Sequence, residues 1–361
     1  MRCMVLTLSL TIALGGGLAA ARADEPDPIA LVDYTEPTED SGEVYDTDGS
    51  LLDASPGDDW AMPRQWFDSP NYGTYVQIDA LWLARANSVN RKIAVELPGN
   101  TQKLNARDAS LSDSLDIGQM YTLGYRFDKI SAIEATFFGF NDWNNSATAF
   151  DPTGNLGLAG TLQLATTDFI FADRMTINYS SSLYNAEVNY KQTIEGMTLL
   201  AGFRYFNLNE RFDVNSHNPI FNESSDYNVS VVNRLIGLQV GAGYNLQFGR
   251  VNLGALAKIG AYANLAHQNT LLQDFGNAIV LRNYRAETSP VSVLGEIQLN
   301  ASYQLYDWLA LRFGYRFIGV NNLALGPNQL DLSNSPTGNK FITAQDYLLL
   351  NGVNAGVEIR W

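Results

Sequence analysis

The last ten residues of the chain, "GVNAGVEIRW" (352–361), have the pattern of a β-strand with one apolar and one polar face. The apolar members are Val353, Ala355, Val357, Ile359 and Trp361, and between them lie Gly352, Asn354, Gly356, Glu358 and Arg360. A period of two is typical of a strand whose faces meet different surroundings. Because the ends of soluble domains usually fray, so regular a terminal strand indicates a closed sheet in which the last strand pairs with the first.

Runs with the same alternation recur along the chain. Ten can be marked, at residues 74–85, 115–127, 132–142, 181–192, 197–209, 231–246, 250–264, 290–305, 308–319 and 346–361. Most are longer than the usual strand of about five or six residues. Together they predict an all-β fold with long strands.

The connections between these runs alternate in length. Four are tight turns, "DKIS", "TIEG", "QFGR" and "YDW", around Lys129, Glu195, Gly249 and Asp307. The other five are long and polar, as in "NDWNNSATAFDPTGN" and "DVNSHNPIFNESSDYN". Compact soluble domains rarely hold several such loops, whereas short turns at one rim and long loops at the other are typical of outer-membrane barrels. We therefore predict a transmembrane antiparallel up-and-down β-barrel of about ten strands. Twelve is the alternative if "GLAGTLQLATTDFIFADRMTINYSS" adds another pair.

The N-terminal segment predicts secretion. A cation at Arg2, an apolar run from Met4 to Leu14 and small residues before a break after Ala23 are typical of a cleaved signal peptide. The apolar run is too short to span a bilayer. We therefore assign residues 1–23 to a signal peptide. The single cysteine, Cys3, leaves with it, so no disulfide or thiolate metal site is expected in the mature chain.

The segment that follows is acidic. From Asp24 to Pro63 there are thirteen acidic residues and no Lys or Arg, together with many Pro, Gly and Ser residues. This composition predicts a disordered, solvated tether over 24–66; a cation- or partner-binding tail is the alternative. The barrel is assigned to 67–361. Setting aside the two arginines of the signal and these thirteen acidic residues leaves 25 acidic and 21 basic residues, which is not the basic balance of a nucleic-acid binder.

Tyrosine and tryptophan gather near the short turns. The predicted aromatic girdle consists of Tyr75, Tyr125, Tyr190, Tyr244, Tyr303, Trp308 and Trp361, and Phe127 lies at the same level. These rings favour the headgroup layer of a membrane, and barrels carry such girdles at their interfaces. Scatter along the strands would be expected if the rings reflected strand propensity alone.

Charged residues fall on the opposite parity, which should face the barrel interior. The predicted lumen-lining residues are Arg126, Glu187, Arg204, Lys258, Glu296, Arg312, Arg316, Glu358 and Arg360, and Asp79, Glu134 and Lys191 share the face. Buried charges need partners or water, and about eight strands already leave a side-chain-filled interior. We therefore expect a narrow or partly occluded lumen. Counting from the Asp307 turn further predicts one ionic cluster of Glu296, Arg312, Arg316 and Glu358, with Arg360 at its edge.

Four segments resemble a beta-barrel porin family described mainly from planctomycete genomes. They are "AIEATFFGF" (132–140), "LLAGFRYFNLNERF" (199–212), "NRLIGLQVGAGYN" (233–245) and the ending "LNGVNAGVEIRW". The order and spacing of these segments also fit, over roughly 72–361. The resemblance implies an outer-membrane barrel and says little about transport, because the family's name rests on its predicted architecture.

No catalytic or metal motif stands out. The two histidines, His217 and His267, fall in expected outer loops without a local motif, and neither G-x-S-x-G nor HExxH is present. "DVNSHNPIFNESSD" lacks the EF-hand spacing for calcium. We therefore expect a non-enzymatic protein with no cofactor, no catalytic residue and no metal site.

The function we predict is porin-like passage of small polar solutes by a monomeric barrel in the outer membrane of a Gram-negative-type bacterium. Its expected partners are outer-membrane lipid, the assembly machinery that reads the C-terminal strand, and small polar solutes, with no nucleic acid. A structural or surface-interaction protein acting through its outer loops is the alternative, and a rim-located hydrolase is a third hypothesis. The first two differ in conductance; the third would require hydrolysis that depends on a histidine.

Overall fold

The structure, a computed structural model, describes residues 73–86, 88–112, 115–335, 338 and 340–361. The chain divides into two units, Met1–Asp59 and Trp60–Trp361, and all the described residues belong to the second. The predicted signal peptide (1–23) and tether (24–66) lie outside the described residues. None of the helices in the described part of the chain is long and apolar enough to cross a membrane.

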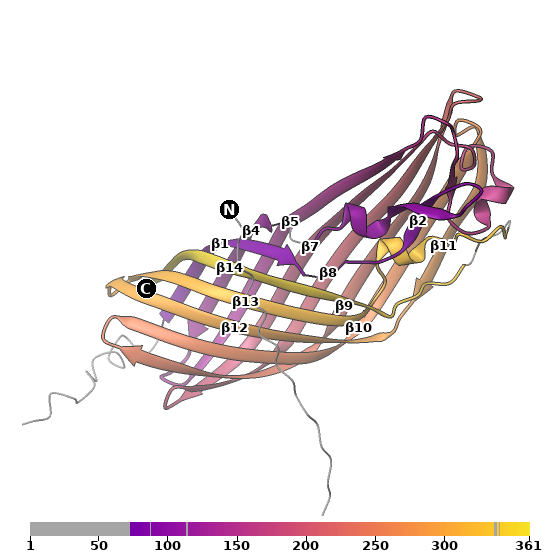
Figure 1. The fold of residues 1–361 in the computed structure, drawn as a ribbon. Coiled ribbons are helices and arrows are strands. Elements are labelled where there is room, and N and C mark those ends of the chain that lie inside the picture. Colours follow the sequence, from indigo (N-terminus) through magenta and orange to yellow (C-terminus); the bar gives the residue numbers. More distant parts are fainter. Residues whose placement is uncertain (1–72, 87, 113–114, 336–337, 339) are drawn as a thin grey trace, which may run out of the picture. The chain divides into compact units, whose positions relative to one another are not determined.

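Ten antiparallel strands close into a barrel (Figure 1). They are β1 (Gly73–Arg85), β4 (Leu115–Arg126), β5 (Ser131–Phe150), β7 (Arg174–Ile194), β8 (Met197–Asn218), β9 (Glu223–Phe248), β10 (Val251–Asp274), β12 (Val291–Tyr306), β13 (Leu309–Leu323) and β14 (Asp346–Arg360). Strand β11 (Ile279–Thr288) continues the line of β12 along β10 rather than adding to the circumference. The ten-strand prediction is confirmed, and the residues proposed for an extra pair of strands do not widen the barrel.

The terminal strand closes the sheet. Strand β14 pairs with β1 along its length, from Tyr75 opposite Arg360 to Arg85 opposite Leu350. Each backbone N–H of Thr74 and Trp361 donates to the carbonyl of the other at 3.0 Å. The closed seam leaves no sheet edge there, because each strand has a partner on both sides.

Two of the five expected long loops are strands joined by short connections, and parts of a third are strand as well. The β8–β9 connection spans residues 219–222 and the β10–β11 connection spans 275–278. The polar stretches "NDWNNSATAF" and "DVNSHN" form the ends of β5 and β8. On the upper part of β8 the alternation persists with its sense reversed: Phe212 and Val214 are buried inside, and the polar residues face outward. The polar outer face made these strands resemble loops.

A bulge in β5 changes which parity faces inward. Phe140 has no partner where β7 residues pair with Gly139 and then Asn141, and its φ is 64°. An extra residue of this kind shifts the pleat by one. As a result Phe138 and Trp143 are both buried, which explains why bulky rings near Phe140 occupy both parities.

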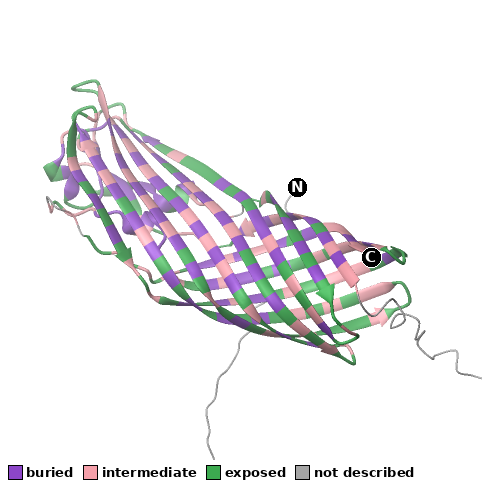
Figure 2. Ribbon diagram, turned by 180° about the vertical axis from the view of Figure 1, so that it is seen from behind, coloured by how far each residue is buried: buried purple, intermediate pink, exposed green. Residues whose placement is uncertain are grey.

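The outward face has an apolar band and, above it, a polar wall. Figure 2 shows how buried and more exposed residues alternate along these strands. On β8, outward residues are apolar or aromatic from Met197 to Tyr205 and polar from Asn207 to His217. The apolar stretch has the length of roughly 9–11 residues that a tilted membrane strand requires. On β10 the same change occurs between Leu265 and His267. The strands β5 and β7–β11 therefore rise beyond the apolar band.

Loop segments pack against the inward face of these tall strands and form what we call the plug. The plug comprises β2 (Lys92–Glu96), β3 (Thr101–Asn105), η2 (Ala106–Ala109), β6 (Leu156–Leu158), η3 (Leu162–Ala165), η4 (Gly326–Gln329) and the described residues beside them. Its sheet, β3-β2-β6, is separate from the barrel wall. Ile93, Leu158 and Phe169 of the plug share one hydrophobic core with inward wall residues such as Phe206 and Val229. Apolar packing thus occupies the half of the lumen that lies away from the short turns, which we call the outer half. The half nearer the short turns is the inner half.

Candidate functional site

The inner half of the lumen contains a buried ionic group that we call the central network: Glu187, Arg204, Lys258, Glu296 and Arg316. Glu296 forms ion pairs with Arg204, with Lys258 (Nζ to Oε2, 3.1 Å) and with Arg316 (Nη1 to Oε1, 2.8 Å). Glu187 pairs with Arg204 (Nη2 to Oε2, 3.0 Å) and Lys258 (Nζ to Oε1, 2.8 Å). All five side chains are buried. Three cations therefore share two carboxylates away from bulk solvent.

Sheet register places these charges together. Glu187 of β7 lies opposite Arg204 of β8, and Lys258 of β10 lies opposite Glu296 of β12. Strand β9 separates the two pairs, and its Gly241 is opposite Lys258. A Cβ at Gly241 would lie 3.0 Å from Cγ of Lys258, so this inward glycine leaves room for the lysine stem.

Neutral polar side chains complete the network. The amide of Gln239 donates to Glu187 at 2.6 Å and to Asn189 at 2.7 Å, and Gln298 donates to Glu296 at 2.5 Å. Buried carboxylates require such donors, because an unsatisfied charge in a low-dielectric interior is strongly unfavourable.

A second group, the seam network, lies beside the closing strands. Arg312 pairs with Glu358 at 2.9 Å and with Asp79 at 3.6 Å, and Arg360 pairs with Glu358 at 2.5 Å. The prediction of one cluster containing Glu296, Arg312, Arg316 and Glu358 is therefore wrong in one respect: these residues divide between two networks. Arg316 turns toward Glu296 and Phe138, its guanidinium lying 4.7 Å from the centre of that ring, while Arg312 turns toward the seam.

A third group lies close to the short-turn end. Glu134 forms an ion pair with Lys191 and accepts a hydrogen bond from the Tyr75 hydroxyl. Arg126 is exposed, and its guanidinium is 5.3 Å from the centre of the Tyr75 ring. Tyr75 points into the barrel and is 6% exposed, so its assignment to the girdle is wrong. The residue opposite, Gly124, has no Cβ, and a Cβ there would lie 2.0 Å from Cζ of Tyr75.

The other six girdle residues lie on the outer face. They are Tyr125, Tyr190, Tyr244, Tyr303, Trp308 and Trp361, all exposed near the short turns or the C-terminus. The rings of Trp308 and Tyr306 stack at a centroid distance of 5.8 Å. Contact of these rings with a membrane interface stays a prediction.

Further buried charges join the wall to the plug, and sequence reasoning did not select them. Arg85 pairs with Glu210 at 2.7 Å, and Glu210 also accepts from the backbone N–H of Gly326 at 2.8 Å. Arg282 donates to the carbonyls of Asp331 at 2.7 Å and Ser333 at 2.5 Å. Sequence could have indicated Arg85 and Glu210, because both continue the inward-facing alternation of β1 and β8.

Carboxylates at the plug and at a short turn have shifted pKa values. Burial raises the pKa of Asp346, which accepts from the Leu325 N–H at 3.1 Å and from Asn328 at 2.6 Å. At the β4–β5 turn, the backbone N–H groups of Ile130 and Ser131 lower the pKa of Asp128. Protonation of Asp346 is therefore coupled to packing of the plug, and the Asp128 carboxylate stabilises the turn.

The two histidines face outward on strands, not in loops as expected. His217 Nδ1 is 2.7 Å from Asp173, and His267 Nδ1 is 3.2 Å from Glu287. Among the described residues, no group of three or more His, Cys, Asp or Glu side chains could hold a metal ion.

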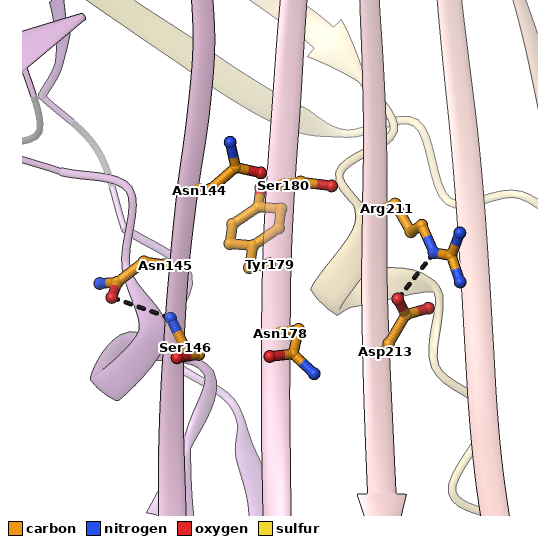
Figure 3. A pocket seen from close by; sticks show the side chains of 8 residues that line it. All are labelled: Asn144, Asn145, Ser146, Asn178, Tyr179, Ser180, Arg211 and Asp213. Atoms are coloured by element: carbon orange, nitrogen blue, oxygen red, sulfur yellow. Dashed lines mark hydrogen bonds and ion pairs between the residues drawn. The ribbon is translucent and has the colours of Figure 1, made fainter.

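The polar wall above the apolar band carries a shallow depression of about 570 Å³ (Figure 3). Its lining residues are Asn144, Asn145, Ser146, Asn178, Tyr179, Ser180, Arg211 and Asp213, from β5, β7 and β8. Arg211 and Asp213 pair at 2.6 Å. The depression offers hydrogen-bond donors and acceptors on the outside of the barrel.

No family model and no curated protein matches the chain. Among solved structures, it is similar to the outer membrane protease OmpT from Escherichia coli (10% identity, TM-score 0.42, covering 81% of this chain and 97% of that one). It is also similar to the translocator domain of the autotransporter NalP from Neisseria meningitidis (9%, 0.37, 80% and 89%) and to the P. putida toluene transporter TodX (10%, 0.30, 83% and 92%). Likenesses at these TM-scores carry no information about function. The resemblance to the planctomycete porin family stays a prediction.

Proposed function

We propose that the protein is a porin-like barrel of the outer membrane of a Gram-negative-type bacterium, in which the charged inner lumen is the path for small polar solutes and the plug restricts that path. Outer-membrane lipid and the machinery that assembles outer-membrane barrels are its expected partners, the latter through the C-terminal strand ending at Trp361. Secretion through the N-terminal signal belongs to the same proposal.

Passage is supported by the position of the central network, whose charges lie inside the barrel at the height of the apolar outer band. Lys258 points inward between Ala257 and Ile259, which are exposed on the apolar outer band. Glu296 is likewise next to the exposed Ile297. Ionisable groups at membrane depth are unfavourable and usually mark a solute or ion path. A barrel serving as a mere anchor could fill this volume with apolar side chains.

The plug explains why the path is restricted. It is built from connections rather than from the wall, and Arg91 holds its parts together by donating to the carbonyls of Pro327 and Asn328 at 3.1 and 2.7 Å. Ala84 of β1 and Leu115 of β4 are paired across the sheet. The segment between them, including β2, β3 and η2, can therefore be replaced by a short turn without breaking the β1–β4 pairing.

Single-channel recording in planar bilayers tests the proposal. The wild type should conduct weakly, and the variant in which a Gly-Asn turn joins Arg85 to Leu115 should conduct much more. The matched control is Asn178→Ala, which changes the outer wall but no lumen residue. If neither wild type nor the turn variant conducts, although both fold into heat-modifiable barrels, the proposed passage is wrong.

A second candidate, surface interaction, is favoured by the tall polar wall and its depression. In this case the outer face, rather than the lumen, would bind a partner. Arg211→Ala with Asp213→Ala would then abolish binding to that partner and leave conductance unchanged.

A further inference from the structure

The lumen differs in charge from the rest of the barrel region. Apart from the Arg85–Glu210 pair and the other charges that contact the plug, its inward charged set comprises seven cations (Arg126, Lys191, Arg204, Lys258, Arg312, Arg316 and Arg360) and five anions (Asp79, Glu134, Glu187, Glu296 and Glu358). The barrel region as a whole has more acidic than basic residues. The positive excess is therefore a property of the lumen and not of the composition.

Within the central network, part of this excess has no protein partner. Nε and Nη1 of Arg204 and Nε of Arg316 are buried, and among the described residues none accepts from them with full hydrogen-bond geometry. The Tyr262 hydroxyl is the acceptor that lies beside the Arg204 guanidinium. Both guanidinium groups pair with Glu296, so they lie on either side of one carboxylate. Buried N–H donors without an acceptor are rare and need an explanation, and a guanidinium has five such donors.

We infer that the lumen selects small inorganic anions and that the unpartnered guanidinium edges of Arg204 and Arg316 bind the anion as it passes. An anion at this position balances the net positive charge of three cations and two carboxylates. It also accepts hydrogen bonds from the guanidinium N–H groups that lack a protein acceptor. Arginine and lysine side chains in a pore favour anions for the same electrostatic reason. The inference rests on the proposed passage and names its solute class.

Two changes alter lumen charge without removing an ion pair. Asn300 and Ser302 face inward on β12 and are partly exposed to the lumen. Asn300→Asp with Ser302→Asp adds two negative charges, so the inward charged set then has as many anions as cations. Asn228→Asp with Asn283→Asp adds the same charge on the outward face of β9 and β11, so this variant is the control.

Reversal potentials across a KCl gradient give the first test. Wild type and the outer-wall control should show a chloride-selective reversal potential, and the lumen variant should shift it toward zero or to the cation side. Cation selectivity in the wild type, or equal shifts in both variants, would overturn the inference while passage itself stands. Absence of conductance from the wild type and the turn variant would overturn passage.

Anion binding can also be measured without conductance. Replacing gluconate by chloride at constant ionic strength should raise the unfolding midpoint of the wild type more than that of Arg316→Gln. Removing Arg316 leaves two cations and two carboxylates, so this variant keeps every remaining charge paired. The same chloride response in both proteins would rule out the guanidinium site.

Discussion

Glu296 and Arg316 form an ion pair, yet replacing one should affect stability far more than replacing the other. In Glu296→Gln, three buried cations are left with Glu187 as the one carboxylate of the central network, and Arg316 loses its ion-pair partner. Leaving a buried charge without its partner costs about 3–5 kcal/mol. In Arg316→Gln, two cations face two carboxylates, and the main loss is the contact with the Phe138 ring, which is worth about 1 kcal/mol.

The assay is reversible urea unfolding in lipid vesicles, followed by tryptophan fluorescence, for both single variants and the double variant. Because Arg316→Gln removes the cation that Glu296→Gln leaves unpaired, the double variant should be more stable than Glu296→Gln alone. This rescue distinguishes charge balance from packing. Equal losses in the two single variants, or a double variant that loses the sum of both, would refute the reasoning.

Four further predictions concern other parts of the molecule. Ala257→Arg, on the outward face within the apolar band, should lower the unfolding free energy by about 2–4 kcal/mol, whereas Asn228→Arg on the polar wall should have little effect; equal losses would show that β10 does not face lipid. Arg312→Ala with Arg316→Ala should widen the lumen and raise single-channel conductance, and channels that are already large and do not respond would contradict occlusion. Protease added to intact cells should cut at the β8–β9 turn and spare "TIEG" between β7 and β8, and the opposite pattern would reverse the topology. Burial raises the pKa of Asp346, so its contribution to stability is present at low pH and is lost as the pH rises from the unfolded-state pKa through the folded-state pKa. Asp346→Asn should remove that part of the pH dependence of plug stability, measured by hydrogen exchange. An unchanged pH profile in this variant would contradict the prediction.

The sequence alone determined the wall of the barrel in the half that carries the apolar outward band. Alternation fixes which residues share a face, and tight turns fix the register of neighbouring strands, so Gln298 opposite Arg316 could be counted from the Asp307 turn. The same reasoning gave the closing β14–β1 pair and the inward charges. These features depend on interactions between residues that are local or on adjacent strands.

The tertiary structure decided which surroundings each face meets. A period of two indicates that Phe212 and Val214 share a face, but it does not indicate whether that face meets lipid or the plug. In the structure this apolar face lies inward, because it packs against the plug, whose segments are distant in sequence. The bulge at Phe140 and the inward ring of Tyr75 depend on the neighbouring strands in the same way, through one unpaired residue and through the space at Gly124. The ion pair between Arg204 on β8 and Glu296 on β12 spans two intervening strands. Such contacts follow from the curvature of the closed sheet, which brings side chains on non-adjacent strands within reach across the lumen.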